Sequence, residues 1–183
     1  MTTGQDVQPV AAGPDATLPI QSGPALVFMV GNPHTGKSTL FNRLTGQNAR
    51  VGNYPGVTVE RRTGKLRLDS GVQADVIDAP GAYSLSARSA EEQIALEAIL
   101  GLHGNPEPTL ALVVVDAGQL ARNLYLVLQL AELGVPMVIA LNMIDEVGDN
   151  PPDPAAIGAL FGVPVVAVSA RRGQGMAELS RAL

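Results

Sequence analysis

A glycine-rich segment at residues 31–38 constrains the fold of this chain more than any other feature. It reads Gly-Asn-Pro-His-Thr-Gly-Lys-Ser, which fits the phosphate-binding loop pattern G-x-x-x-x-G-K-S. An apolar, β-prone run at 25–30 precedes it, and residues 38–45 suit a helix that ends at Gly46. Strand, glycine loop and helix in this order predict a mononucleotide site, because backbone N–H groups and the helix N-terminus can bind phosphate.

Each residue of this segment has an expected contact with the nucleotide. Lys37 would contact the β- and γ-phosphates, and the Ser38 hydroxyl would bind Mg²⁺. The other residues expected to bind the nucleotide here are Asn32, Pro33, His34, Thr35, Gly36 and Thr39. A glycine-rich turn before an ordinary helix is the competing interpretation, and it leaves the combination of both flanks unexplained.

Composition narrows the class of protein. The chain has 183 residues, of which 46% are hydrophobic and 16% charged, as expected for one globular domain. Aromatic residues are few, so the core must consist of Val, Leu, Ile and Ala, as in parallel α/β sheets. The absence of Cys excludes disulfides and thiol catalysis, and the net charge of −5 argues against nucleic acid as a partner.

Two further expectations concern the ends of the chain and its location. The longest apolar runs are too short for a membrane span and no signal peptide is evident, so a cytoplasmic location is expected. Residues 1–24 are rich in Gly, Pro, Gln, Thr and Asp, which predicts a disordered tail or linker. Residues 25–183 would form one domain, and the short amphipathic stretch 176–183 predicts truncation within the last helix.

The rest of the chain predicts alternating strands and helices. Strands are expected at 25–30, 59–68, 72–77, 110–115, 135–141 and 163–168, and further helices at 89–100, 119–133, 154–161 and 176–183. Residues 69–71 would form a hairpin turn, whereas 47–58 has turn formers without a pattern and is expected to be a long loop. This order predicts a doubly wound α/β fold, with a mostly parallel six-stranded sheet, one antiparallel edge strand and helices on both faces.

Polar residues recur where the predicted strands end, and carboxyl ends of parallel strands form ligand sites. Asp78 is placed to hold Mg²⁺ through a water, although an aspartate in a turn before Pro80 is the alternative. Gly81 would offer its N–H to a γ-phosphate, or it is a plain turn glycine. Thr58 could bring a hydroxyl to Mg²⁺, but a threonine at the start of a strand is an equally good interpretation.

The segment Asn142-Met143-Ile144-Asp145 is the candidate base reader. A carboxylate can accept two hydrogen bonds from the guanine N1–H and amine, whereas adenine offers no such pair of donors. Asp145 would therefore select guanine, and Asn142 would support the loop and contact the other edge of the base. Ser169 and the backbone N–H of Ala170, which would bind the guanine O6, follow the last strand.

Together these motifs resemble the small GTP-binding proteins, and more closely the G domain of the ferrous iron transport protein B family. The similarity covers about residues 25–183 and is carried by the segments 31–33 with 35–42, 51–60, 78–81 with 83–85, 123–126 and 142–145, of which 51–60 is the most family-specific. The resemblance implies a Ras-like fold and a slow, Mg²⁺-dependent GTP hydrolysis. It also implies that Gly56, Val57 and Thr58 belong to a first switch and that Gly81 to about Glu92 form a second.

The resemblance further implies a larger protein around this domain. Family members continue into a helical regulatory domain and then into a membrane domain that carries Fe²⁺. The full-length protein is accordingly expected at the cytoplasmic face of the cell inner membrane, with guanine nucleotide as the ligand of this domain.

At two positions this chain carries a residue different from the one that such enzymes use in hydrolysis. His34 stands where the family usually has Asn, which is implied to offer an oxygen to potassium, so potassium activation is not expected here. Three interpretations of His34 remain open. Its side chain points to solvent, or it replaces the potassium ligand so that potassium activation is lost, or it is protonated beside the triphosphate and acts as a cation itself. Ala82 follows Gly81, so no glutamine orients the attacking water, a lack that the family shares.

The sequence leaves three functions to compare. The first is a slow GTPase in which Lys37, Thr58 and Gly81 act on the reacting phosphate. The second is a GTP/GDP switch with negligible turnover. The third, a P-loop ATPase or small-molecule kinase, would need a lid and a basic substrate pocket and would leave Asn142-x-x-Asp145 unexplained.

Overall fold

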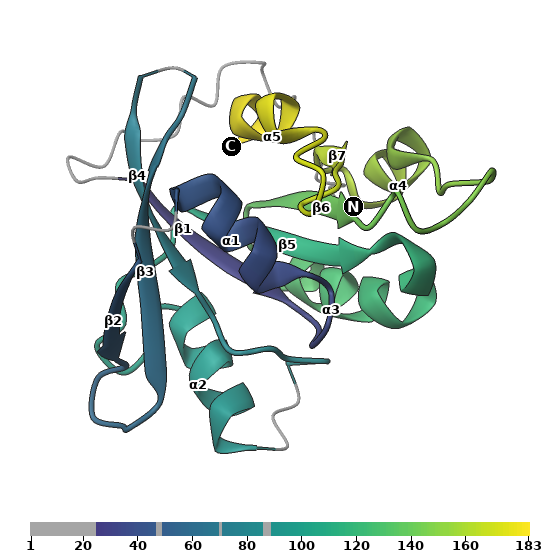
Figure 1. The fold of residues 1–183 in the computed structure, drawn as a ribbon. Helices are drawn as coiled ribbons and strands as arrows, with labels where there is room; N and C mark the ends of the chain where they lie inside the picture. Colours follow the sequence, from purple (N-terminus) through teal and green to yellow (C-terminus); the bar gives the residue numbers. More distant parts are fainter. Residues whose placement is uncertain (1–24, 47–48, 70, 86–88) are drawn as a thin grey trace, which may run out of the picture.

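Seven strands form a single sheet in the order β2-β3-β4-β1-β5-β6-β7 (Figure 1). The computed structural model describes residues 25–46, 49–69, 71–85 and 89–183, so the predicted tail at 1–24 lies outside the described residues. The strands are β1 (Ala25–Gly31), β2 (Arg50–Asn53), β3 (Glu60–Arg67), β4 (Gln73–Asp78), β5 (Leu110–Asp116), β6 (Met137–Asn142) and β7 (Val165–Ala167). Strands β4, β1, β5, β6 and β7 are parallel, whereas β3 is antiparallel to both β4 and β2.

The doubly wound, mostly parallel α/β fold is confirmed, but the predicted count of six strands is wrong. Strand β2 forms inside the segment predicted as a long loop, with Arg50 opposite Thr63 and Asn53 opposite Glu60. All four residues of β2 are exposed, so the strand has no buried face and shows no alternation of apolar residues. The antiparallel strand β3 is therefore second from the edge rather than at it.

Helices connect the parallel strands, and capping residues mark several of their ends. They are α1 (Lys37–Thr45), α2 (Ala90–Ile99), α3 (Leu120–Glu132), α4 (Pro154–Phe161) and α5 (Met176–Ala182), with a 3₁₀ turn η1 (Ala117–Gln119) before α3. Ser89 Oγ accepts the Glu92 N–H at 3.1 Å, and Asp153 Oδ1 accepts the Ala155 N–H at 2.9 Å. Gly46 ends α1 in the left-handed conformation, with φ 63°.

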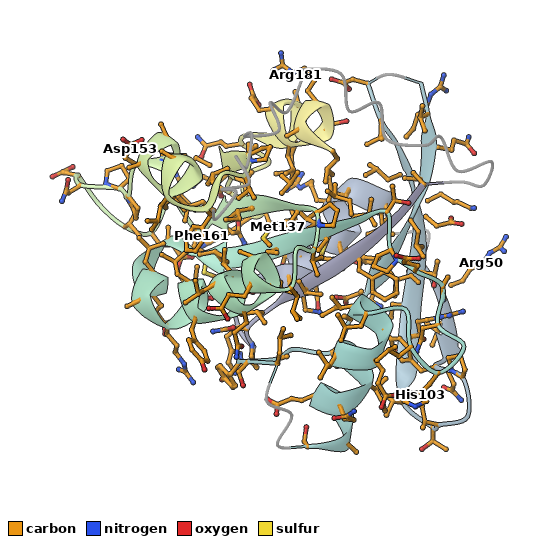
Figure 2. The ribbon with its side chains drawn as sticks, turned by 180° about the vertical axis from the view of Figure 1, so that it is seen from behind. Arg50, His103, Met137, Asp153, Phe161 and Arg181 are labelled. Carbon is orange, nitrogen blue, oxygen red and sulfur yellow. The ribbon has the colours of Figure 1, made fainter. Side chains whose placement is uncertain are left out.

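The helices cover both faces of the sheet. Val27 and Met29 of β1 pack with Leu40 and Phe41 of α1 and with Leu179 of α5, whereas Val30 packs with α3 on the other face. Figure 1 shows α1 and α5 in front of the sheet and α3 behind it. In the reverse view of Figure 2, Met137 lies in the interior and Arg50 projects from the outer edge. No helix among the described residues is long and apolar enough to cross a bilayer.

The register of the sheet brings the motif-bearing strand ends together. Met29 of β1 is paired with Asp78 of β4, and Gly31 is paired with Val114 of β5. Asp116 at the end of β5 is paired with Asn142 at the end of β6. The carboxyl ends of the parallel strands therefore bring together the phosphate loop, Asp78 and the segment that begins at Asn142.

Candidate functional site

The phosphate loop connects β1 to α1 with a backbone that requires glycine at Gly36. This residue has φ 78°, and a Cβ there would lie 2.4 Å from Nδ2 of Asn142, so no larger residue fits. The buried Thr35 Oγ1 donates to the Asn32 carbonyl at 2.9 Å. A cavity of about 450 Å³ opens in front of the loop and is lined by Asn32, Pro33, His34, Gly36, Lys37, Ser38, Thr39 and Gly81.

His34 lies at the mouth of this cavity in an unusual backbone conformation. Its φ is 69°, in the left-handed region that residues other than glycine rarely adopt and that Asn, Asp and His tolerate best. The side chain is exposed and offers an imidazole nitrogen rather than an oxygen. A hard potassium ion prefers oxygen ligands, so the residue present here does not fit a potassium site.

Lys37 and Asp78, predicted to act on phosphate and on Mg²⁺, are in direct contact. Lys37 Nζ donates to the Asp78 carboxylate and to the carbonyl of Ala79. Thr58 is brought to the same place, because a second cavity of about 440 Å³ is lined by Lys37, Thr58, Val59, Glu60, Arg62, Asp78, Ala79 and Pro80. Two of the three predicted metal-binding side chains therefore share one cavity with the phosphate lysine.

Arg62 is a member of this site that the sequence analysis missed. Its Nη1 lies 3.9 Å from Asp78 Oδ2, and its Nη2 donates to Asn42 Oδ1 at 3.1 Å. The guanidinium also lies over the Phe41 ring, 5.2 Å from the centroid. Arg62 and Asp78 are opposite each other in the antiparallel β3–β4 pair, and both are eight positions along the chain from residue 70, the middle of the predicted turn. Counting outward from the predicted hairpin turn would have found this pair.

Tyr54 anchors the segment between β2 and β3, and this corrects the expectation of a long loop at 47–58. Its side chain is 2% exposed and packs with Phe28, Ile77 and Ile94. The backbone N–H of Tyr54 donates to the Val59 carbonyl at 3.0 Å. Burial raises the pKa of the Tyr54 hydroxyl above its ordinary value, and the negative charge of Asp78 raises it further.

The remaining switch residues divide into an exposed group and a docked group. Gly56, Val57 and Thr58 are exposed on the turn before β3. Gly81 is docked on the phosphate loop, since a Cβ at Gly81 would lie 3.1 Å from Pro33 Cγ. The next residue, Ala82, donates its N–H to the Gly31 carbonyl at 3.2 Å. Residues 86–88 of the predicted second switch lie outside the described residues.

Asn142 connects the phosphate loop to the loop that follows β7. Its Nδ2 donates to the Thr35 carbonyl at 2.9 Å, and its Oδ1 accepts the Ala170 N–H at 2.9 Å. The side chain is 2% exposed, so both hydrogen bonds are shielded from water. The Ala170 N–H, predicted to bind the guanine O6, is bonded to Asn142 in this structure.

Asp145 is a buried, ionised acceptor at the same end of the site. Its side chain is 4% exposed, and Arg172 Nε lies 3.1 Å from Oδ2. The hydrogen bond from the Ser169 side chain holds the pKa of the Asp145 carboxyl below its ordinary value. A backbone hydrogen bond and the positive charges of Arg172 and Arg171 act in the same direction, against the effect of burial. Met143 has φ 62°, and its Cε would lie 3.3 Å from a Cβ at Gly36.

The oxygen donors of the site fit Mg²⁺. Ser38 and Thr58 carry hydroxyls and Asp78 carries a carboxylate, and a hard cation prefers such ligands. The described residues contain no group of three or more His, Cys, Asp or Glu side chains that could hold a metal by themselves.

Comparison with known proteins places this arrangement in a family. The family model described as ferrous iron transport protein B matches residues 25–183. A fusion protein of Fe(2+) transport protein A and Fe(2+) transporter FeoB from Porphyromonas gingivalis is 47% identical over 156 residues. That alignment covers 84% of this chain and 18% of the relative, so the chain spans about a fifth of the length of the curated relatives it matches.

Solved structures of FeoB share the fold. The G domain of the T. maritima FeoB iron transporter is 36% identical, with a TM-score of 0.77 over 86% of this chain and 94% of that one. A GDP-bound mutant of the S. thermophilus FeoB G domain is 42% identical, with a TM-score of 0.75 over 84% of this chain and 57% of that one. The chain therefore belongs to the ferrous iron transport protein B family, and its described residues have the fold of that family's G domain.

Proposed function

We propose that this chain binds GTP and GDP and slowly hydrolyses GTP, as the nucleotide-binding domain of a ferrous iron transporter. The observation that carries the proposal is the position of Asn142, which bonds to the phosphate loop and to the Ala170 loop beside the buried Asp145. One site thus combines a phosphate cradle with a carboxylate acceptor. The similar G domain from S. thermophilus was solved with GDP, which supports guanine as the base.

The base end of the site would select guanine through hydrogen-bond donors. The Asp145 carboxylate would accept the guanine N1–H and the exocyclic amine, and adenine has no equivalent pair. The Ala170 N–H would turn from Asn142 Oδ1 to the guanine O6. Asn142 would keep its hydrogen bond to the Thr35 carbonyl, so the base-binding end of the site would stay fixed relative to the phosphate loop.

The phosphate end would bind and polarise the γ-phosphate. Lys37 would leave the Asp78 carboxylate for the β- and γ-phosphate oxygens, and the Gly81 N–H would donate to the γ-phosphate. The Ser38 and Thr58 hydroxyls would hold Mg²⁺, with Asp78 acting through a water. When bound, Mg²⁺ neutralises charge on the phosphate oxygens.

Hydrolysis would proceed by in-line attack of water on the γ-phosphate, with positioning and charge neutralisation as the main contributions. Position 82, where Ras-type enzymes carry a glutamine, holds an alanine whose side chain is buried. No side chain at that position can orient the water, so a slow intrinsic rate is expected. The helical regulatory domain, the membrane domain and transport of Fe²⁺ belong to the proposal for the whole protein.

Displacement of a fluorescent GDP analogue tests the choice of base. Unlabelled GTP should compete and ATP should not, whereas equal competition by ATP would favour the ATPase or kinase interpretation. Single-turnover hydrolysis without partner proteins then tests the reaction. Slow release of phosphate supports a GTPase, and tight GTP binding without any turnover supports a nucleotide switch.

A further inference from the structure

The last turn of α1 is fastened to the loop that follows β7. Arg43 Nε donates to the Ala170 carbonyl at 3.2 Å, and Arg43 Nη2 donates to the Arg171 carbonyl at 2.9 Å. A Cβ at Gly173, where φ is +77°, would lie 3.4 Å from Arg43 Nη1. One guanidinium therefore donates to two carbonyls of this loop and lies beside Gly173.

The loop held by Arg43 also carries the base-reading contacts. Ser169 and Arg172, on either side of the carbonyls that Arg43 binds, both act on the Asp145 carboxylate. Ala170 itself donates its N–H to Asn142. Any movement of the loop would displace the partners of both Asp145 and Asn142.

Helix α1 therefore contacts both halves of the nucleotide site. It begins at Lys37, the phosphate lysine, and its last turn carries Arg43. A nine-residue helix is a rigid element, so its two ends keep a fixed separation. Arg43 is the described side chain of α1 that bonds to the loop at 169–175.

We propose that Arg43 is a positioning residue for base recognition, which holds residues 169–173 in place and thereby sets the lifetime of the bound guanine nucleotide. This inference rests on the proposed guanine-nucleotide function. GTP and GDP share the base, so removal of Arg43 must weaken both equally. The γ-phosphate lies at the opposite end of α1, so the chemical step at saturating GTP must be unaffected.

A simpler role for Arg43 would be its charge near the C-terminus of α1, which favours the helix dipole. Arg43→Lys separates the two roles. Lysine keeps the charge, but it has one ammonium and cannot donate to two carbonyls with the planar fork of arginine. Arg67→Ala is the matched control, because the Arg67 side chain is exposed on β3 and makes no hydrogen bond or ion pair with the described residues.

The test measures dissociation of fluorescent GDP and of a fluorescent non-hydrolysable GTP analogue, together with kcat and KM for GTP. Loss of two charge-assisted hydrogen bonds should speed dissociation of both nucleotides roughly 10- to 100-fold in Arg43→Ala. Arg43→Lys should fall between Arg43→Ala and the unaltered chain, with KM raised and kcat within about twofold in both variants. Arg67→Ala should match the unaltered chain.

Three results would overturn the role of Arg43. They are unaltered dissociation in Arg43→Ala, full recovery in Arg43→Lys, and an effect on only one of the two nucleotides. Thermal unfolding shows which variants are folded, and if Arg43→Ala is not, Arg43→Lys decides, because it must still release nucleotide faster than the unaltered chain. Failure of the unaltered chain to bind GDP would instead overturn the proposed function, and this inference with it.

Discussion

Arg172 Nε lies 3.1 Å from Oδ2 of Asp145, although the arginine side chain is 62% exposed and the aspartate side chain only 4%. The exposed Arg172 therefore forms an ion pair with the buried carboxylate of Asp145. Ser169 holds the same carboxylate through its side chain. The acceptor proposed to read the base is thus fixed in orientation by the loop that follows β7.

Replacement of Asp145 tests the reading of guanine. Asp145→Asn exchanges one acceptor for an amide donor that faces the guanine amine, so GTP affinity should fall roughly a thousandfold. The same variant should gain affinity for xanthosine nucleotides, whose C2 carbonyl can accept from the new amide. Fluorescent nucleotide titration measures both. Asp149→Asn is the matched control, since Asp149 is exposed in the same region; unchanged GTP affinity in Asp145→Asn would refute guanine selection.

The lowered pKa of Asp145 sets the direction of a pH effect on stability. The fold favours the ionised carboxylate, so this contribution is fully present above the ordinary value of 3.8 and is lost as pH falls through the lowered pKa. Ser169→Ala should raise the pKa toward 3.8, so acid unfolding should begin at a higher pH.

Acid titration followed by circular dichroism measures this shift. Because Ser169 is the largest cause of the lowered pKa, its removal should move the acid midpoint further than Arg172→Ala does. A larger shift in Arg172→Ala would show that the ion pair, and not the hydrogen bond, keeps Asp145 ionised.

Position 34 should decide the response to potassium. The unaltered chain should hydrolyse GTP at rates within about twofold in sodium and potassium buffers, because the imidazole offers no oxygen ligand. His34→Asn should create potassium stimulation, and asparagine also tolerates the φ of 69° at this position. Strong potassium stimulation of the unaltered chain would show that the ion binds without the asparagine.

The first switch should respond to the γ-phosphate over a short segment. Strand β2 and Tyr54 anchor its start, so slower hydrogen exchange with a non-hydrolysable GTP analogue and Mg²⁺ is expected at Gly56, Val57 and Thr58. Thr58→Ala should abolish the difference from the GDP-bound state. Equal protection with both nucleotides in the unaltered chain would count against a switch in this segment.

Tyr54 should limit the stability of the domain. Its buried hydroxyl has no hydrogen-bond partner among the residues that the structure describes. Tyr54→Phe removes that unpaired group and should raise the free energy of unfolding by about 1 kcal/mol in urea titrations. Tyr125→Phe, at a side chain that is 53% exposed, should leave it unchanged. Destabilisation by Tyr54→Phe would mean that the hydroxyl has a partner in solution.

Local patterns in the sequence were sufficient for much of the fold and of the site. The uninterrupted apolar run at 110–115 is buried from Ala111 onward and forms most of β5. The glycine pattern located the phosphate loop, because its backbone conformation depends on Gly36. Asn142 and Asp145 were found from their spacing at the end of a predicted strand.

What the sequence did not reveal depends on contacts without a local pattern. Tyr54 is a single aromatic residue between two polar turns, so no periodicity marks it as buried. Arg43 contacts a loop far along the chain, and Arg172 reaches Asp145 from another loop. Such pairings follow from the order of strands in the sheet, which composition and spacing leave open.

The place of β1 in the sheet has a consequence for how the domain folds. As the first described strand it lies between β4 and β5, where Val27 is opposite both Val76 and Leu110. The strands β2, β3 and β4 can pair as neighbours along the chain, but β1 is paired on both sides only when β4 and β5 are both in place. The phosphate loop, which follows β1, thus depends on strands from both halves of the sheet. A nucleotide that binds this loop selects the fully assembled domain, and by mass action it would stabilise the entire sheet.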